Sequence, residues 1–206
     1  MKAIIQRVSK ASVTVGKEQI SSIGRGLCVL LGISAEDTQN DADYIMRKIL
    51  NLRLFEDDNG RAWSKSVMEK ELEVLCVSQF TLQCVLKGNK PDFHLAMSAD
   101  FAQAFYNNIL EQMRTTYKPE LIKDGQFGAC MQVQIHNDGP VTICLESPCG
   151  PTDAKQMSKQ EKQQQRKEKT SKGNLESGRD KGALTSTVDF NASNEAEGDV
   201  FSGRDL

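Results

Sequence analysis

The chain opens with an apolar pattern that is typical of β-strands. β-Branched residues recur through residues 1–15 without a helix start or stop, which predicts a strand. Gly16-Lys17 predicts a turn, residues 19–23 a short return strand, and residues 26–33, which are almost entirely apolar, a buried strand. We therefore expect three strands before the first helix.

Apolar residues at helical spacing then predict two long helices. The first begins at Ser34, with Asp37 three residues on at a position that suits an acid, and continues to about residue 52. The second is capped by Ser98-Ala99-Asp100 and continues to about Tyr117, before Pro119. Its predicted apolar face consists of Phe101, Phe105, Ile109, Leu110 and Met113.

Further strands are predicted at residues 52–55, 72–77, 128–136 and 141–145, and a loop is predicted at residues 87–91. The elements follow one another as βββαβ(β)αββ, so we predict an α+β fold with a mainly antiparallel sheet. Strands this few and this irregularly ordered argue against a doubly wound parallel sheet. The chain also contains no GxGxxG, P-loop or HExxH motif.

Residues 137–142, Asn-Asp-Gly-Pro-Val-Thr, lie between the last two predicted strands. Asp-Gly at such a place normally indicates a two-residue hairpin turn, but Pro140 removes a backbone N–H that the hairpin ladder would use. Two interpretations stay open: a rigid loop that presents backbone carbonyls, or an ordinary turn with a trans Gly-Pro bond. The trans turn is favoured because only about 5–6% of X–Pro bonds in folded proteins are cis.

Composition divides the 206 residues into a domain at residues 1–150 and a charged tail at residues 151–206. The domain is close to neutral. Within the tail, residues 155–181 contain nine basic and four acidic residues, and residues 182–206 contain one basic and five acidic residues. Low hydrophobicity and high charge predict that the tail is disordered. The basic block has enough charge for sequence-independent contacts with phosphate groups, and a solvated charged tail explains it equally well.

The six cysteines show no zinc spacing, and most lie in apolar runs where a thiol is a small core residue. No metal site and no cofactor are predicted. No signal peptide is predicted, and the sequence contains no run of 18 apolar residues. We therefore expect a soluble protein of a reducing, intracellular compartment with no membrane partner.

Side chains suited to acid–base chemistry are few. His94 and His136 are better explained as surface or structural residues, and no carboxylate pair stands out. At Ser78-Gln79-Phe80-Thr81-Leu82, however, a predicted strand ends and three hydrogen-bonding side chains occupy four positions. Backbone N–H groups at a strand end can stabilise an oxyanion, and a plain polar strand terminus is an equally good interpretation.

Several of these stretches together resemble the signature motifs of the D-aminoacyl-tRNA deacylases, also called D-tyrosyl-tRNA deacylases. The Lys/Gln-rich extension resembles that of the animal members, one of which is also described as a DNA-unwinding-element-binding protein. The likeness covers about residues 1–147 in order and spacing. It rests on residues 78–82, 87–93 and 137–142, and also on residues 1–8 and 125–129.

The resemblance implies a barrel-like α+β homodimer with active sites at the subunit interface. It also implies that the Gly139–Pro140 bond is cis and enters the partner's pocket, where both carbonyls bind the amino group of the substrate and exclude an L side chain. Arg7 would lock this loop, and Asn137 belongs to its substrate-binding surface. Because main-chain atoms read only chirality, such a site should accept many D-residues and also glycine.

The implied reaction is hydrolysis of the ester that joins the amino acid to the terminal adenosine of tRNA. Backbone N–H groups near Gln79 and Phe80 would form the oxyanion hole, Ser78 and Gln79 would position the substrate, and Phe127 would stack on the adenine. Thr81 matches a residue once favoured as a nucleophile. No base lies near it in the sequence, so the 2′-OH of the tRNA is the better participant.

A second hypothesis is a DNA-binding, replication-associated protein that acts through residues 155–181. Salt-dependent DNA binding that disappears without residues 152–206, while deacylation stays intact, would separate the two functions. A catalytically inactive structural dimer is disfavoured because both site motifs are intact. We expect a cytoplasmic location, with the nucleus as an additional one.

Overall fold

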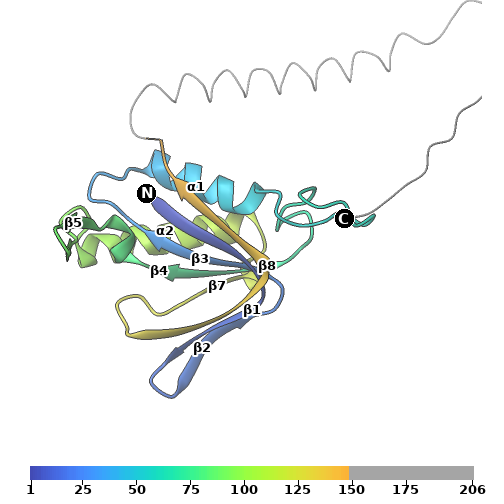
Figure 1. Ribbon diagram of the computed structural model, residues 1–206, viewed down its shortest axis with the longest axis horizontal. Helices are drawn as coiled ribbons and strands as arrows, with labels where there is room; N and C mark the ends of the chain where they lie inside the picture. Colours follow the sequence, from blue (N-terminus) through green and yellow to red (C-terminus); the bar gives the residue numbers. More distant parts are fainter. Residues whose placement is uncertain (149–206) are drawn as a thin grey trace, which may run out of the picture. The chain divides into compact units, whose positions relative to one another are not determined.

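A computed structural model describes residues 1–148, and the predicted tail at residues 151–206 lies outside the described residues. Three strands precede the first helix, as the sequence predicted (Figure 1). In this range no helix is long and apolar enough to cross a membrane. The elements in chain order are β1 Lys2–Val15, β2 Glu18–Ile23, β3 Gly26–Gly32, α1 Gln39–Asn51, β4 Glu73–Ser78, the 3-10 turn η1 Phe80–Gln83, β5 Val85–Lys87, β6 Lys90–Asp92, α2 Ala99–Thr116, the 3-10 turn η2 Pro119–Leu121, β7 Ile122–Asp124 and β8 Met131–Glu146.

Six strands form one curved sheet in the order β2-β1-β3-β4-β7, and β8 pairs along β1 as well. β1 is antiparallel to β2, β3 and β8, whereas β4 is parallel to both β3 and β7. The parallel pairs arise because a helix connects their strands: α1 lies between β3 and β4 in the chain, and α2 between β4 and β7. The predicted α+β fold with a barrel-like, mainly antiparallel sheet is confirmed (Figure 1).

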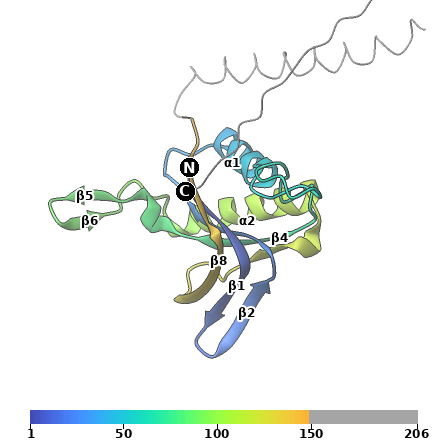
Figure 2. The same cartoon turned by 45° about the vertical axis from the view of Figure 1, so that its right-hand side comes forward.

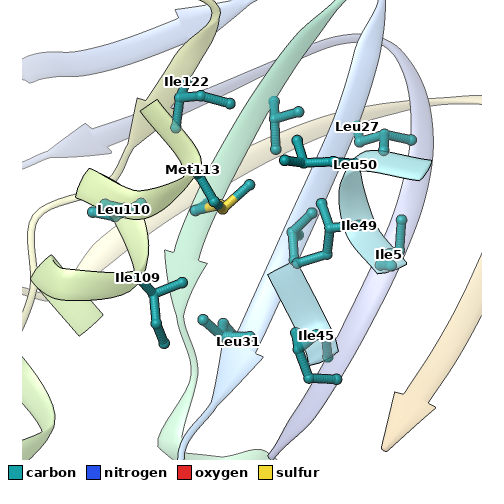
Figure 3. Packing of buried hydrophobic residues seen from close by; sticks show 14 of the residues in the cluster. Ile5, Leu27, Leu31, Ile45, Ile49, Leu50, Ile109, Leu110, Met113 and Ile122 are labelled. Atoms are coloured by element: carbon teal, nitrogen blue, oxygen red, sulfur yellow. The ribbon is translucent and has the colours of Figure 1, made fainter. Parts of the chain in front are cut away.

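The main core lies between the sheet and the two helices. Burying a Leu, Ile or Met side chain contributes about 1.5–3 kcal/mol. The buried faces of the two helices therefore hold the helices against the strands. Figure 3 shows Ile45, Ile49 and Leu50 of α1 and Ile109, Leu110 and Met113 of α2 beside Ile5, Leu27 and Leu31 of β1 and β3.

β3 is apolar along its length because both of its faces are covered. Leu27 and Val29 belong to the main core, whereas Cys28 belongs to a second cluster that also contains Leu75 of β4. Apolar side chains of β8 pack against this second cluster. A strand that is covered on both faces has a continuous apolar sequence. The buried strand predicted at residues 26–33 is confirmed.

The first helix begins at Gln39, one turn later than the sequence predicted. Thr38 is its N-cap and forms a capping box with Asp41, whose carboxylate accepts a hydrogen bond of 2.9 Å from the Thr38 N–H. Asp37 closes a separate turn, in which the Ser34 N–H donates to its carboxylate at 2.6 Å. Both pairs have the same spacing of a hydroxyl residue and an acid, so the sequence pattern alone pointed to the wrong pair.

The second helix begins next to Ser98, as predicted, but its buried face is rotated from the predicted one. Phe101 is 75% exposed, whereas Ala102 and Tyr106 are buried. Tyr106 is turned inward, where its hydroxyl donates a hydrogen bond of 3.0 Å to the carbonyl of Cys76. The buried positions at residues 109, 110 and 113 agree with the prediction.

Residues 131–146 form one long strand rather than the two strands that the sequence predicted. β8 pairs with β1, but the pairing jumps from Val141 opposite Arg7 to Asn137 opposite Val8, so that residues 138–140 bulge out of the ladder. The resemblance also implied a cis Gly139–Pro140 bond. This prediction is wrong, because every described peptide bond is trans. Trans is the isomer that X–Pro bonds favour by about 0.5–1 kcal/mol.

Two smaller predictions differ from the structure. Residues 52–55 are not a strand, because Phe55 makes only an isolated bridge with Lys65. Residues 87–91, predicted as a loop, belong to a hairpin in which Lys87 pairs with Lys90 and Gly88 has a φ of 62°. A positive φ suits glycine, which lets two residues reverse the chain. The hairpin projects from the body of the protein (Figure 2).

Candidate active site

The strand end at Ser78 leads directly into a 3-10 turn. The N–H of Gln79 donates a hydrogen bond of 2.8 Å to the carbonyl of Leu31, so the oxyanion donor expected at Gln79 is engaged in the sheet. In η1 the first bond joins the Leu82 N–H to the Gln79 carbonyl at 3.2 Å. The N–H groups of Phe80 and Thr81 precede this bond and have no acceptor within residues 1–148. Phe80 and Thr81 therefore carry the free donors of this turn.

The turn is held against the end of β3 by close backbone packing. The buried side-chain amide of Gln83 donates a hydrogen bond of 2.9 Å to the Gly32 carbonyl. A Cβ atom on Gly32 would lie 2.7 Å from the Cβ of Leu82 and 2.9 Å from the Gln79 carbonyl oxygen. Glycine at position 32 thus permits an approach that any side chain would obstruct.

The side chains of the turn show no strong base. The Thr81 hydroxyl accepts a hydrogen bond from the side-chain amide of Gln79, and no histidine or carboxylate of the described chain bonds it. Phe80 is 58% exposed, and its ring meets Phe93 edge-on with the centroids 5.2 Å apart. The turn therefore offers backbone donors and amide groups, and an unactivated hydroxyl.

Neither histidine is hydrogen-bonded to the turn. His94 lies after the β5–β6 hairpin, where it contacts Asp92. The hydrogen bonds from Lys87 and His94 hold the pKa of the Asp92 carboxyl well below its usual range. His136 is exposed on β8. The arrangement agrees with the interpretation of both histidines as surface or structural residues.

Arg7 contacts the bulge at residues 138–140 directly. Its Nε donates a hydrogen bond of 3.2 Å to the Asp138 carbonyl and lies 3.4 Å from the Asp138 carboxylate. Gly139 has a φ of 105°, and a Cβ there would lie 2.7 Å from Nη2 of Arg7. The contact expected between Arg7 and this loop is therefore present. Arg25 also reaches the Asp138 carboxylate, at 3.8 Å, and the sequence analysis missed Arg25.

The two motifs do not meet within one chain. Ser78 lies opposite Leu31, which lies opposite Ala3, whereas the bulge lies beside Arg7. Four residues along a strand correspond to roughly 13 Å, and β1 and β3 separate the two motifs sideways. In Figure 1 the end of β4 beside β5 and the bend of β8 lie at different ends of the sheet. One chain therefore supplies the two halves of the expected site at separate places.

Phe127 packs against the main core beside α2. Its ring packs against Tyr106 with the centroids 5.7 Å apart, and the Tyr106 hydroxyl bonds the Cys76 carbonyl, two residues before Ser78. Burial raises the pKa of Tyr106, so this phenol is a neutral donor at physiological pH. Sequence reasoning missed Tyr106 because nothing local distinguishes it from an exposed helix residue.

A largely apolar hollow of about 580 Å³ lies at the start of α2. Its wall is joined to the residue after β3, because the Met97 N–H donates a hydrogen bond of 3.1 Å to the carbonyl of Ile33. Two places far apart in the chain form it, Ala35 and residues 96–105, so no local motif pointed to it. Its lining consists of Ala35, Ala96, Met97, Ser98, Phe101, Ala104 and Phe105.

This geometry suits stabilisation of an oxyanion by backbone N–H groups rather than acid–base catalysis by a charged side chain. Within residues 1–148 no three His, Cys, Asp or Glu side chains are grouped as metal ligands. Cys28 and Cys76 are buried, and burial raises their pKa values to about 11 and about 12, so neither is a reactive thiolate at neutral pH.

Comparison with known proteins identifies a family. The model of the D-Tyr-tRNA(Tyr) deacylase family matches residues 4–146. D-aminoacyl-tRNA deacylase 1 of Danio rerio is 76% identical over 206 residues, and the protein of the same name from Homo sapiens is 66% identical over 209 residues; each alignment covers all of both chains. D-aminoacyl-tRNA deacylase of Drosophila melanogaster is 60% identical over 148 residues, which cover 72% of this chain and 93% of that protein.

Two solved structures share the fold. A structure described as the c-Myc DNA Unwinding Element Binding Protein is 72% identical, with a TM-score of 0.70, and the match covers 72% of this chain and all of that one. A probable eukaryotic D-amino acid tRNA deacylase is only 17% identical, with a TM-score of 0.61, over 70% of this chain and 97% of the other. The second likeness concerns the fold alone.

Proposed function

The chain belongs to the D-Tyr-tRNA(Tyr) deacylase family, and we propose that it hydrolyses the ester bond of D-aminoacyl-tRNA and releases the free D-amino acid and the tRNA. Relatives that are 66% and 76% identical over the full chain are named D-aminoacyl-tRNA deacylase 1, so the protein is a hydrolase of this class. The observation that carries the mechanism is the pair of free N–H groups at the end of β4.

In the proposed reaction the N–H groups of Phe80 and Thr81 stabilise the oxyanion that forms when the ester carbonyl is attacked. Donors that are already oriented cost no reorganisation, and removing one such donor costs about 10²–10³ in kcat in well-studied hydrolases. Ser78 and Gln79 position the substrate. Because the Thr81 hydroxyl has no base beside it, the 2′-OH of the terminal ribose, and not Thr81, assists the reaction.

We assign the reading of chirality to the backbone of Gly139 and Pro140. Residues 138–140 leave the pairing with β1, so their carbonyls are free of the ladder. A rigid carbonyl close to the substrate Cα can accept the amino group and occupy the space of an L side chain. Such a gate contacts no side chain, so it accepts different D-residues. It also accepts mischarged glycyl-tRNA, because glycine has no side chain to exclude.

The separation of the two motifs supports a homodimer as the active form. The bulge of one chain lies roughly 13 Å along the strands from the row of its own Ser78, too far for both to contact one aminoacyl group. In a dimer the bulge of one subunit would face residues 78–81 of the other. Phe127 would stack on the terminal adenine, and Asn137 would contact the substrate beside the gate.

Hydrolysis of matched D-tyrosyl- and L-tyrosyl-tRNA tests the proposal. The purified protein, with and without residues 152–206, should release D-tyrosine rapidly and L-tyrosine slowly. Replacement of Pro140 by Ala should loosen the bulge and reduce the ratio of the two rates. Equal rates for both substrates, or an unchanged ratio in the Pro140→Ala variant, would contradict the carbonyl gate.

A second function, DNA binding through residues 155–181, is favoured by one comparison. The neighbour that is 72% identical is described as a DNA unwinding element binding protein. The basic block of this chain, which lies outside the described residues, has a net charge of +5 for electrostatic contact with phosphates. DNA affinity that falls with salt and disappears without residues 152–206 would support it. With this function the protein would work in the nucleus as well as in the cytoplasm.

A further inference from the structure

Two arginines from different strands converge on the same carboxylate in the bulge. Arg7 lies on β1, and Arg25 directly precedes β3. The Asp138 carboxylate lies 3.4 Å from Nε of Arg7 and 3.8 Å from Nε of Arg25. We use the name arginine clamp for Arg7, Arg25 and Asp138 together with residues 54–56, to which both arginines are bound.

Each arginine of the clamp uses its other nitrogens on residues 54–56. Nη1 of Arg7 donates a hydrogen bond of 2.6 Å to the Leu54 carbonyl. Nη2 of Arg25 forms an ion pair of 2.7 Å with the Glu56 carboxylate, and the guanidinium of Arg25 lies 5.6 Å from the centre of the Phe55 ring. A guanidinium has a fixed planar set of donors, so a contact on one edge determines the direction of the other.

Residues 54–56 are in turn fixed to the core. Leu54 and Phe55 are buried in the main cluster. The Phe55 N–H donates to the Lys65 carbonyl at 3.0 Å, and its carbonyl accepts from Ser64 at 2.9 Å. The clamp thus connects a buried, hydrogen-bonded part of the core to the exposed bulge, whose residues 138–140 do not pair with β1.

We infer that Arg25 and Glu56 are positioning residues that set the direction of the Gly139–Pro140 carbonyls. Glu56 orients Arg25, Arg25 and Arg7 hold Asp138 from two sides, and Asp138 directly precedes the proposed gate. The inference rests on the proposed function, because it takes the bulge as the reader of chirality. Ion pairs at the surface contribute little to overall stability, whereas a misplacement of about 1 Å in a site can cost about 10²-fold in rate. Loss of the clamp should therefore change selectivity more than folding.

A spectroscopic reporter, Trp63, lies beside the clamp. Trp63 is the single tryptophan of the chain, and its ring lies 5.8 Å from Cζ of Arg7. The ring is 57% exposed, and because Arg7 lies over it, a displacement of Arg7 should change the surroundings of the ring. We therefore expect the emission of Trp63 to report the position of Arg7 independently of any reaction.

The experiment compares Glu56→Gln and Arg25→Ala with the control Asp58→Asn in the full chain. Asp58 is an exposed acid two residues beyond Glu56, and it pairs with Lys70 instead of the clamp. We measure kcat/KM for D-tyrosyl- and L-tyrosyl-tRNA and the emission spectrum of Trp63. Both clamp variants should lower the ratio of kcat/KM for D-tyrosyl-tRNA to kcat/KM for L-tyrosyl-tRNA by about tenfold or more. They should also shift the emission of Trp63, whereas the control should change neither quantity. Arg25→Lys should not restore the ratio, because one ammonium cannot replace the two separate edges of the guanidinium.

The possible failures are distinguishable. A wild-type protein that hydrolyses both substrates equally would overturn the proposed reading of chirality, and the clamp's role with it. A wild-type preference for the D substrate that survives both clamp substitutions would overturn the clamp alone. A change in Trp63 emission without a change in the ratio of D to L rates would also overturn the role of the clamp. The clamp contacts would then exist without determining the direction of the Gly139–Pro140 carbonyls.

Discussion

The side-chain amide of Gln83 donates a hydrogen bond of 2.9 Å to the carbonyl of Gly32, 51 residues earlier in the chain. Gln83 is 5% exposed, and glutamine is seldom buried without a partner. The bond fastens the 3-10 turn to the end of β3, the strand that also receives the Gln79 N–H. A buried amide thus orders the two free backbone donors at Phe80 and Thr81.

Replacement of Gln83 by Met should destabilise the protein while keeping the shape of the side chain. The Gly32 carbonyl would lose its buried donor, which costs about 1–3 kcal/mol. Chemical denaturation followed by circular dichroism measures this loss, and deacylation should also slow because the turn is released. A variant as stable as the wild type would mean that the bond does not hold the turn.

Gly32→Ala should impair the site more than the fold. The added Cβ would lie 2.7 Å from the Cβ of Leu82, so the turn must move away from β3. A displacement of a catalytic group by about 1 Å can lower the rate by about 10²-fold. We expect a loss of this order in kcat/KM for D-tyrosyl-tRNA. Gly24→Ala is the control, because a Cβ there meets only a flexible Glu73 oxygen at 3.4 Å. Equal activities of the two variants would contradict the assignment of the turn.

Thr81→Ala should leave substantial deacylase activity. The substitution removes only the acceptor of the Gln79 side chain, whereas loss of a true nucleophile costs on the order of 10⁶-fold in kcat in subtilisin. Single-turnover hydrolysis of D-tyrosyl-tRNA measures the difference. Complete loss of activity in a folded variant would restore Thr81 as the nucleophile.

Glu56 should contribute to stability above about pH 4.5 and lose that contribution in acid. The hydrogen bond from Arg25 is the main cause that lowers the pKa of Glu56 from 4.5 to about 2. Because the folded-state pKa lies below the unfolded one, protonation between about pH 4.5 and pH 2 removes the stabilisation. As the pH is lowered from about 4.5 to 2, the free energy of unfolding should therefore fall less steeply in Glu56→Gln than in the wild type. Parallel curves for the two proteins would show that the ion pair is absent in solution.

The sequence by itself determined the features that depend on local pattern. The continuous apolar run of β3, the helices near residues 39–51 and 99–116 and the polar turn after Ser78 each have a signal within a few residues. The order of the motifs was sufficient to indicate the family. These features could be predicted because periodicity and turn chemistry are properties of neighbouring residues.

The tertiary structure alone decided which of several equivalent local signals is used. Ser34 and Thr38 have the same capping pattern, and in the folded chain Thr38 is the N-cap of α1. Phe101 and Tyr106 are both aromatic residues of α2, but only Tyr106 is buried, and its hydroxyl bonds the Cys76 carbonyl. The N–H of Gln79 was lost as an oxyanion donor because Leu31, from a distant part of the chain, accepts it. The clamp around Asp138 arises in the same way, since its partners lie on separate segments. Contacts between distant residues leave no local periodicity, so only the folded chain reveals them.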